Sequence, residues 1–292
     1  MTSIIQQFKA FLYQVGYGES TQNMLPACVS EFMDHQQIKD INCIEQEKVK
    51  KFYWHLHERP LKKRSGALSE MMISHYVYAL KTFFSWLEIT GQIDYNPISG
   101  MKFKRAKQHV REPLTTDEIK LLFEAAGSLK ERALLHVFYS CGLRRSEGEA
   151  LNIQDIHFKG QLLFVREGKC AKRRVVPVTE RVSKSLEDYY LHERCNSTVK
   201  NVKDMQAFIL NKRGYRMKGD GYNKMLKELL EKTRNAELIT HHCTLHHLRH
   251  SIATHLLQSG MSMEYVRDFL GHTFLETTQL YAKPHAGQLK LL

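Results

Sequence analysis

The stretch of residues 241–281 constrains the fold of this chain more than any other part of the sequence. Its pattern predicts an amphipathic helix, a glycine-methionine turn at 260–261, and a second helix that ends in Leu-Gly-His at 270–272. His246 and Arg249 are three residues apart, so a helix places both side chains on one face. Both side chains can therefore converge on one anion.

The polar groups of this stretch suit chemistry at a phosphodiester. The guanidinium of Arg249 offers a planar fork of donors that matches phosphate oxygens. His272 follows Gly271 at a predicted helix end, from which its ring can point into a cleft, and Tyr281 supplies a hydroxyl nine residues later. Such groups together can attack a phosphodiester and stabilise its pentacoordinate state.

The balance of charge favours a nucleic-acid partner. Over 292 residues, Lys and Arg outnumber Asp and Glu by 43 to 31, which gives a net charge of +12 and a pI near 9.3. A basic surface attracts phosphates and releases counterions. Composition alone also fits an ordinary basic protein, and the length is sufficient for two domains.

The cysteines and the N-terminus indicate the compartment. Six cysteines are scattered without paired spacing, so we expect reduced thiols and no disulfide framework. The first residues lack a signal-peptide pattern, and no apolar run approaches the length of a membrane span. These features predict a cytoplasmic protein that does not associate with membranes.

The first third of the chain reads as a small helical bundle without strands. Apolar periodicity predicts helices at about 3–16, 20–36 and 44–58, and a fourth that Ser69 caps and Gly91 ends. The inward face of the first helix is predicted to carry Ile4, Phe8, Phe11, Leu12 and Val15.

Two basic stretches lie beside this bundle. One is in the turn before the fourth helix, and the other follows the bundle in a segment of low apolar content that is flanked by proline. We place a first domain at 1–98, a basic linker at 99–112 and a second domain at 113–292. Solvated surface charge is the alternative reading. The expected DNA contacts are Lys62, Lys63, Arg64, Lys102, Lys104, Arg105 and Lys107.

The second domain is predicted to mix helices with a small sheet. Thr115 and Glu118 form a capping box, and Gly142 ends a helix at about 129–141. A three-stranded antiparallel sheet is expected at 156–158, 162–165 and 175–178, followed by helices at about 180–194 and 220–234 and a short strand at 208–210. The fold class is therefore mainly α with a small antiparallel sheet.

Five motifs resemble those of one enzyme family. His-x-x-Arg-His at 246–250, Leu-Gly-His at 270–272 and Thr-Thr-Gln-Leu-Tyr at 277–281 resemble the C-terminal signature of the tyrosine recombinases, the Xer and phage-integrase family. Gly-Leu-Arg-x-Ser-Glu at 142–147 resembles the family's first arginine motif. The pattern at 168–177, Gly-Lys-x-x-Lys-x-x-x-Val-Pro, resembles its lysine hairpin.

The resemblance implies a role for each matching position. Tyr281 would be the nucleophile and Lys169 the general acid, with Lys172 as the fallback. Glu147 would support Arg144, and His250 would make a structural or secondary contact. Gly148 departs from the expected pattern, because a helix former is expected there. The implied catalytic set is Arg144, Lys169, His246, Arg249, His272 and Tyr281.

The same resemblance implies an architecture and a reaction. A helical core-binding (SAM-like) domain and a mixed α/β catalytic domain would clamp double-stranded DNA. Cleavage would leave a 3′-phosphotyrosine and a free 5′ hydroxyl, and a homotetramer on two DNA sites would exchange strands through a Holliday junction, with or without a second recombinase or accessory protein. Neither ATP, a metal nor any other cofactor would be needed. The resemblance does not distinguish whether the reaction serves integration, excision, inversion or dimer resolution. It implies that the protein acts at the nucleoid.

Three alternatives compete with this hypothesis. A type IB topoisomerase uses the same tyrosine attack without strand exchange, but the short helical N-terminal domain argues against it. A non-catalytic DNA-binding relative would lack a catalytic position, and none is missing. A structural zinc site is the third, because histidines and one cysteine crowd the stretch 241–250; the commitment of His246 to phosphate argues against it.

Overall fold

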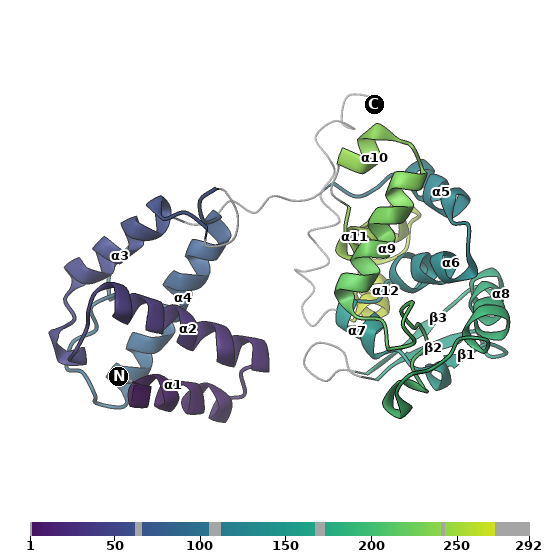
Figure 1. Ribbon diagram of the computed structural model, residues 1–292. Coiled ribbons are helices and arrows are strands. Elements are labelled where there is room, and N and C mark those ends of the chain that lie inside the picture. Colours follow the sequence, from purple (N-terminus) through teal and green to yellow (C-terminus); the bar gives the residue numbers. More distant parts are fainter. Residues whose placement is uncertain (1, 62–65, 105–111, 167–172, 241–242, 272–292) are drawn as a thin grey trace. The chain divides into compact units, whose positions relative to one another are not determined.

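The computed structural model describes residues 2–61, 66–104, 112–166, 173–240 and 243–271. The chain divides into two compact units, Met1–Val110 and Arg111–Leu292, each with its own hydrophobic core. Figure 1 shows the first unit as helices only and the second as helices with a small sheet. Within the described residues, no helix is both long and apolar enough to cross a bilayer.

The first unit contains the four helices that periodicity predicts. They are α1 Thr2–Gln14, α2 Glu19–His35, α3 Gln46–Glu58 and α4 Glu70–Ile89. The Ser69 hydroxyl accepts a hydrogen bond from the amide of Met72 at 3.2 Å, which confirms the predicted cap. Buried aromatic rings join the helices: Phe32 of α2 packs edge-on against Phe52 of α3 and Phe84 of α4.

The predicted inward face of the first helix is wrong at one residue. Phe8 and Leu12 are fully buried, but Val15 is 58% exposed. The reason is that α1 ends at Gln14, and the chain then turns through Gly16, whose φ is +83°. Val15 therefore lies outside the helix that would have turned it inward.

The second unit combines eight helices with one sheet in its described part. The helices are α5 Thr116–Ala125, α6 Leu129–Leu135, α7 Arg145–Ala150, α8 Glu180–Tyr189, α9 Gly219–Lys232, α10 Ala236–Thr240, α11 Leu245–Gln258 and α12 Met263–Leu270. The strands are β1 Ile156–His157, β2 Leu162–Val165 and β3 Arg174–Pro177, in the order β1-β2-β3. Single π-helical turns at His136–Ser140 and Tyr190–Arg194 extend α6 and α8.

Most sequence predictions for this unit are confirmed. The sheet is antiparallel throughout, and Thr115 and Glu118 form the reciprocal capping box of α5. The prediction of a short strand at 208–210 is wrong. The three residues of this segment are buried, but within it only Leu210 forms a bridge, an isolated one with Arg216. The described cysteines, Cys28, Cys43, Cys141, Cys195 and Cys243, are free thiols, as predicted.

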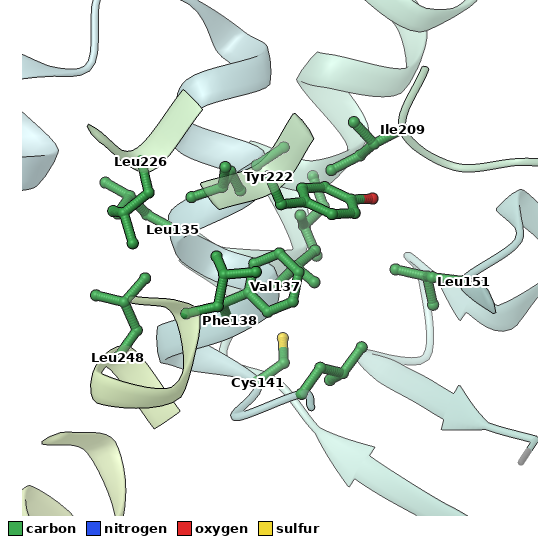
Figure 2. Packing of buried hydrophobic residues seen from close by; sticks show 14 of the residues in the cluster. Leu135, Val137, Phe138, Cys141, Leu151, Ile209, Tyr222, Leu226 and Leu248 are labelled. Atoms are coloured by element: carbon green, nitrogen blue, oxygen red, sulfur yellow. The ribbon is translucent and has the colours of Figure 1, made fainter. Parts of the chain in front are cut away.

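The core of the second unit explains the departure at Gly148. Figure 2 shows Phe138 packed among Tyr222, Leu135 and Leu248, with the Phe138 and Tyr222 ring centroids 4.9 Å apart. A Cβ at Gly148 would lie 2.5 Å from Cζ of Phe138, closer than real side chains approach. The glycine lets α7 lie directly on this ring, and α7 carries the first residues of the site.

Candidate active site

Glu147 lies in the first turn of α7, and three arginines surround its carboxylate. Its carboxylate oxygen Oε1 accepts hydrogen bonds from Nη1 of Arg144 at 2.7 Å and from Nη1 of Arg174 at 2.9 Å. Its Oε2 accepts from Nη2 of Arg174 at 2.8 Å and lies 3.7 Å from Nη1 of Arg249. Three guanidiniums from α11, β3 and the start of α7 therefore meet around one buried carboxylate.

This carboxylate stays ionised despite its burial. Burial by itself raises the pKa of Glu147, but the hydrogen bonds and charge of Arg174 outweigh it, with help from the Arg144 amide and the charge of Arg249. The pKa of Glu147 falls to about 2. Three positive charges therefore face one negative charge, and the cluster keeps an excess of positive charge at neutral pH.

The same three arginines cap the end of α12. Nε of Arg174 donates to the carbonyl of Phe269 at 2.9 Å, Nη2 of Arg249 to that of Leu270 at 2.6 Å, and Nη2 of Arg144 to that of Gly271 at 2.9 Å. The last carbonyls of a helix lack partners within the helix and carry its negative dipole end, so they favour cations. Successive carbonyls thus fix the positions of the three guanidiniums.

The loop before α7 is tied to the same cluster. Nη1 of Arg249 also donates to the carbonyl of Gly142. Gly142 has a φ of +58°, and a Cβ there would lie 2.9 Å from a methyl group of Leu270. The predicted left-handed helix end at Gly142 is confirmed, and it holds the residues before Arg144 against α11 and α12.

The structure brings together three of the residues that the sequence singled out: Arg144, Glu147 and Arg249. Arg249 is 2% exposed, whereas the side chain of Arg144 retains 21% of its exposure. His246 lies one turn before Arg249 in α11 and is exposed, and His250 is partly exposed. The remaining predicted residues lie outside the described part of the chain: Lys169, Lys172, His272 and Tyr281.

Arg174 is the member of the cluster that sequence analysis missed. It is the first residue of β3, where burial alternates: Val175 and Pro177 are exposed, and Val176 is fully buried. Since alternate residues of a strand share a face, Arg174 lies on the same side as Val176. The sequence signal for Arg174 was therefore its place in the strand, two residues before a valine that is expected to face inward.

The histidine-rich stretch contributes to the start of α11. The amide of Thr244 donates to Nδ1 of His247 at 3.0 Å, so this nitrogen acts as an acceptor at the helix start. Among the described residues, no group of three or more potential ligand side chains is placed to hold a metal. His241 and His242 lie outside those residues.

The predicted DNA contacts are only partly within the described residues. Lys102 and Lys104 are exposed, and Nζ of Lys104 lies 2.6 Å from the carboxylate of Glu70, which offsets part of its charge. The others lie outside the described part: Lys62, Lys63, Arg64, Arg105 and Lys107. Residues Met101 and Phe103 of the predicted linker pack on the core of the first unit.

Comparison with known proteins decides the family. Residues 112–287 match the model of the Phage integrase family. The chain belongs to this family of tyrosine recombinases. The recombinase is 30% identical over 285 residues to a tyrosine recombinase of Thermosipho africanus, covering 96% of this chain and 95% of that protein. It is also 30% identical over 257 residues to the tyrosine recombinase XerC of Oceanobacillus iheyensis, covering 86% of this chain and 80% of that protein.

Solved structures share the fold of the recombinase. The integrase of the Tn1549 transposon, in complex with a circular intermediate DNA, aligns with a TM-score of 0.74 at 20% identity and covers 97% of this chain and 95% of its own. The mainly helical fold with a small antiparallel sheet is therefore that of tyrosine recombinases. By its family, this chain is an enzyme that cleaves and rejoins DNA in site-specific recombination through the tyrosine mechanism.

Proposed function

We propose that Arg144 and Arg249 hold the non-bridging oxygens of the scissile phosphate while Tyr281 attacks its phosphorus. The observation that carries this proposal is their convergence on Glu147 and on neighbouring carbonyls of α12. Residues 105 positions apart in the sequence thus share one small cluster of charge. Rigidly held cations of this kind stabilise charge that develops in a transition state.

The electrostatics of the cluster suit this reaction. A phosphodiester carries one negative charge, and its pentacoordinate state carries two. Arg144, Arg174 and Arg249 set against Glu147 leave two positive charges, from three minus one. The cluster therefore matches the charge of the pentacoordinate state better than that of the ground state, which is the requirement for catalysis.

The remaining roles follow the family motifs. As Tyr281 attacks, its hydroxyl releases its proton to the solvent, the bond from its oxygen to phosphorus forms and the bond to the 5′ oxygen breaks. Lys169 gives a proton to that leaving oxygen, with Lys172 as its fallback, and His246 and His272 donate to phosphate oxygens. His250 makes a secondary contact beside them. The 3′-phosphotyrosine conserves the bond energy, so no ATP is consumed.

Strand exchange requires assembly on DNA. We propose that four copies of this chain act on two DNA sites in the cytoplasm, at the nucleoid, with the predicted domains at 1–98 and 113–292 gripping the duplex and the predicted linker at 99–112 joining them. The lysines and arginines of the two basic stretches contact the DNA backbone. These contacts set affinity and register, whereas base contacts set the sequence that is recognised.

Covalent trapping tests the proposed function. A Tyr281→Phe variant first selects the recognised duplex from a random-sequence library. A suicide substrate of that sequence, nicked beside the scissile bond, loses its short 5′-hydroxyl fragment after cleavage and leaves the enzyme attached. Wild-type protein should accumulate the covalent complex, and Tyr281→Phe should bind equally well without forming it. Binding without any covalent product from wild type would favour a non-catalytic DNA-binding protein.

A further inference from the structure

Arg174 is the member of the cluster that engages both carboxylate oxygens of Glu147 through its guanidinium. It pairs with Val165 across the last described rung between β2 and β3, and its side chain is 8% exposed. Its guanidinium makes three hydrogen bonds, two to the carboxylate of Glu147 and one to the carbonyl of Phe269. These bonds link the sheet, α7 and α12.

The carboxylate of Glu147 does not share its hydrogen bonds equally between Arg174 and Arg144. Arg174 engages both carboxylate oxygens through Nη1 and Nη2, which is the favoured fork geometry for a guanidinium and a carboxylate. The guanidinium of Arg144 donates to Oε1 through Nη1 and to the carbonyl of Gly271 through Nη2, and only the backbone amide of Arg144 donates to Oε2. Arg144 remains partly exposed, at 21% of its side chain, whereas only 8% of the Arg174 side chain is exposed.

We propose that Arg174 is a positioning residue that keeps Arg144 directed at the substrate by occupying both oxygens of Glu147. The inference rests on the proposed function, in which Arg144 binds the scissile phosphate. Without Arg174, the carboxylate would offer both oxygens to Arg144, and the fork pair would draw that guanidinium away from the phosphate. The end of α12 would lose one of its three cationic caps at the same time.

Gly271 supports this arrangement because it lies directly against the Arg174 side chain. A Cβ at Gly271 would lie 2.9 Å from Cδ and 3.1 Å from Nη1 of Arg174. The glycine therefore leaves the space through which the Arg174 side chain passes on its way to Glu147. Gly271 and β3 are thus fitted to each other through this arginine.

Methylphosphonate substrates test the proposal. Each diastereomer replaces one non-bridging oxygen with a neutral methyl group, so it lessens the need for the cation that faces that oxygen. Arg174→Ala should slow cleavage of the ordinary phosphodiester by about 100-fold, as loss of a stabilising donor does. The loss of cleavage rate in Arg174→Ala, relative to wild type, should be at least tenfold smaller on the diastereomer that rescues Arg144→Ala. It should not become smaller on the diastereomer that rescues Arg249→Ala. Arg174→Lys, which keeps the charge but not the fork, should show the same pattern more weakly.

Arg194→Ala is the matched control. Arg194 is also buried, at 4% exposure, and it donates to the carbonyls of Ala207 and Met205, away from Glu147. Its loss should lower thermal stability. The ratio of its cleavage rate on the phosphodiester to that on each methylphosphonate diastereomer should equal the ratio for wild type. The positioning role would be overturned if Arg174→Ala and Arg174→Lys each cleaved the phosphodiester and the diastereomer that rescues Arg144→Ala with the same loss of rate. If instead Arg144→Ala itself showed no rescue by either diastereomer, the proposed function would be at fault.

Discussion

Glu147 is the carboxylate around which Arg144, Arg174 and Arg249 meet at the start of α7. A buried carboxylate is stable only when it is paired and hydrogen-bonded, and here Arg144 and Arg174 supply those bonds. The same pairing fixes the guanidiniums that the substrate would meet. In the proposed mechanism, stability and catalysis therefore both depend on Glu147.

Substitution of Glu147 by glutamine should change the pH dependence of stability. The pKa of Glu147 is about 2 in the folded protein against an ordinary value of 4.5, so its stabilising effect is complete above about 4.5 and is lost as the pH falls toward 2. At neutral pH, Glu147→Gln should lower the free energy of unfolding by about 3–5 kcal/mol, because it leaves buried cations without their counterion.

Urea unfolding of both proteins measures this effect. The difference in unfolding free energy between wild type and Glu147→Gln should narrow between neutral pH and about pH 3. A difference that stays constant over this range would contradict the ionised state of Glu147.

Gly148→Ala should destabilise the protein although alanine is the better helix former. The propensity gain of about 1 kcal/mol is outweighed by overpacking against Phe138, which costs about 1–3 kcal/mol. The added Cβ would lie 2.5 Å from the ring. At Gly160 the nearest atom would be 3.8 Å away, so Gly160→Ala serves as the control and should change stability by less than about 0.5 kcal/mol. A more stable Gly148→Ala protein in denaturant titrations would show that the ring has room to move.

Sequence motifs predicted some residues of the site and not others, for a physical reason. Arg144, Glu147 and Arg249 belong to short patterns whose spacing can be read along one helix or turn. The role of Arg174 depends on a strand that meets α7 and α12, and this contact joins residues distant in sequence. Gly148 was read as a weakness of its own helix, because its partner Phe138 lies in another element.

Among the elements, α12 Met263–Leu270 has the most direct influence on the site. Its C-terminal carbonyls receive the three arginines, so its position sets where the positive charge lies. The helix is held in turn by Ser262, whose hydroxyl caps its start, and by Gly271, whose φ of +65° ends it. The predicted end of this helix is confirmed at Leu270 and Gly271, and His272 lies outside the described residues.

Gly271→Ala should impair cleavage more than stability explains. A left-handed alanine costs about 1–3 kcal/mol, and the Cβ would also displace Arg174. Gly260, with a φ of +89° and open space around its Cβ position, provides the matched control. Gly260→Ala should lose similar stability and keep its cleavage rate at a temperature where it is folded. Equal cleavage by both variants would show that contact with Arg174 at Gly271 is unimportant.

Element types were predictable where one period continued for long enough. The helices of the first unit were of this kind, whereas the short strands of the sheet were predicted from β-rich runs between turn residues. The segment 208–210 was not, because three buried apolar residues resemble a strand whether or not a neighbour is present to complete the ladder. The short helix α10 Ala236–Thr240 is too brief to show a period.

At the scale of the whole molecule, two units with separate cores carry a net charge of +12. A chain with this charge that binds DNA should release counterions on binding. We expect affinity for a random duplex to fall steeply with salt, by about 10³-fold or more between about 50 and 200 mM if about six to ten phosphates are contacted. Fluorescence anisotropy at several salt concentrations gives the slope. A slope near zero would mean that the basic stretches do not contact the DNA backbone.

The identity of the residue that becomes joined to DNA tests the account most directly. Covalent complex from the suicide substrate is digested with nuclease and trypsin, and the modified peptide is sequenced by mass spectrometry. The account predicts one adduct, on the peptide that begins at Asp268 and contains Tyr281 as its only tyrosine. An adduct on any other residue, or a full yield of complex from the Tyr281→Phe variant, would contradict it.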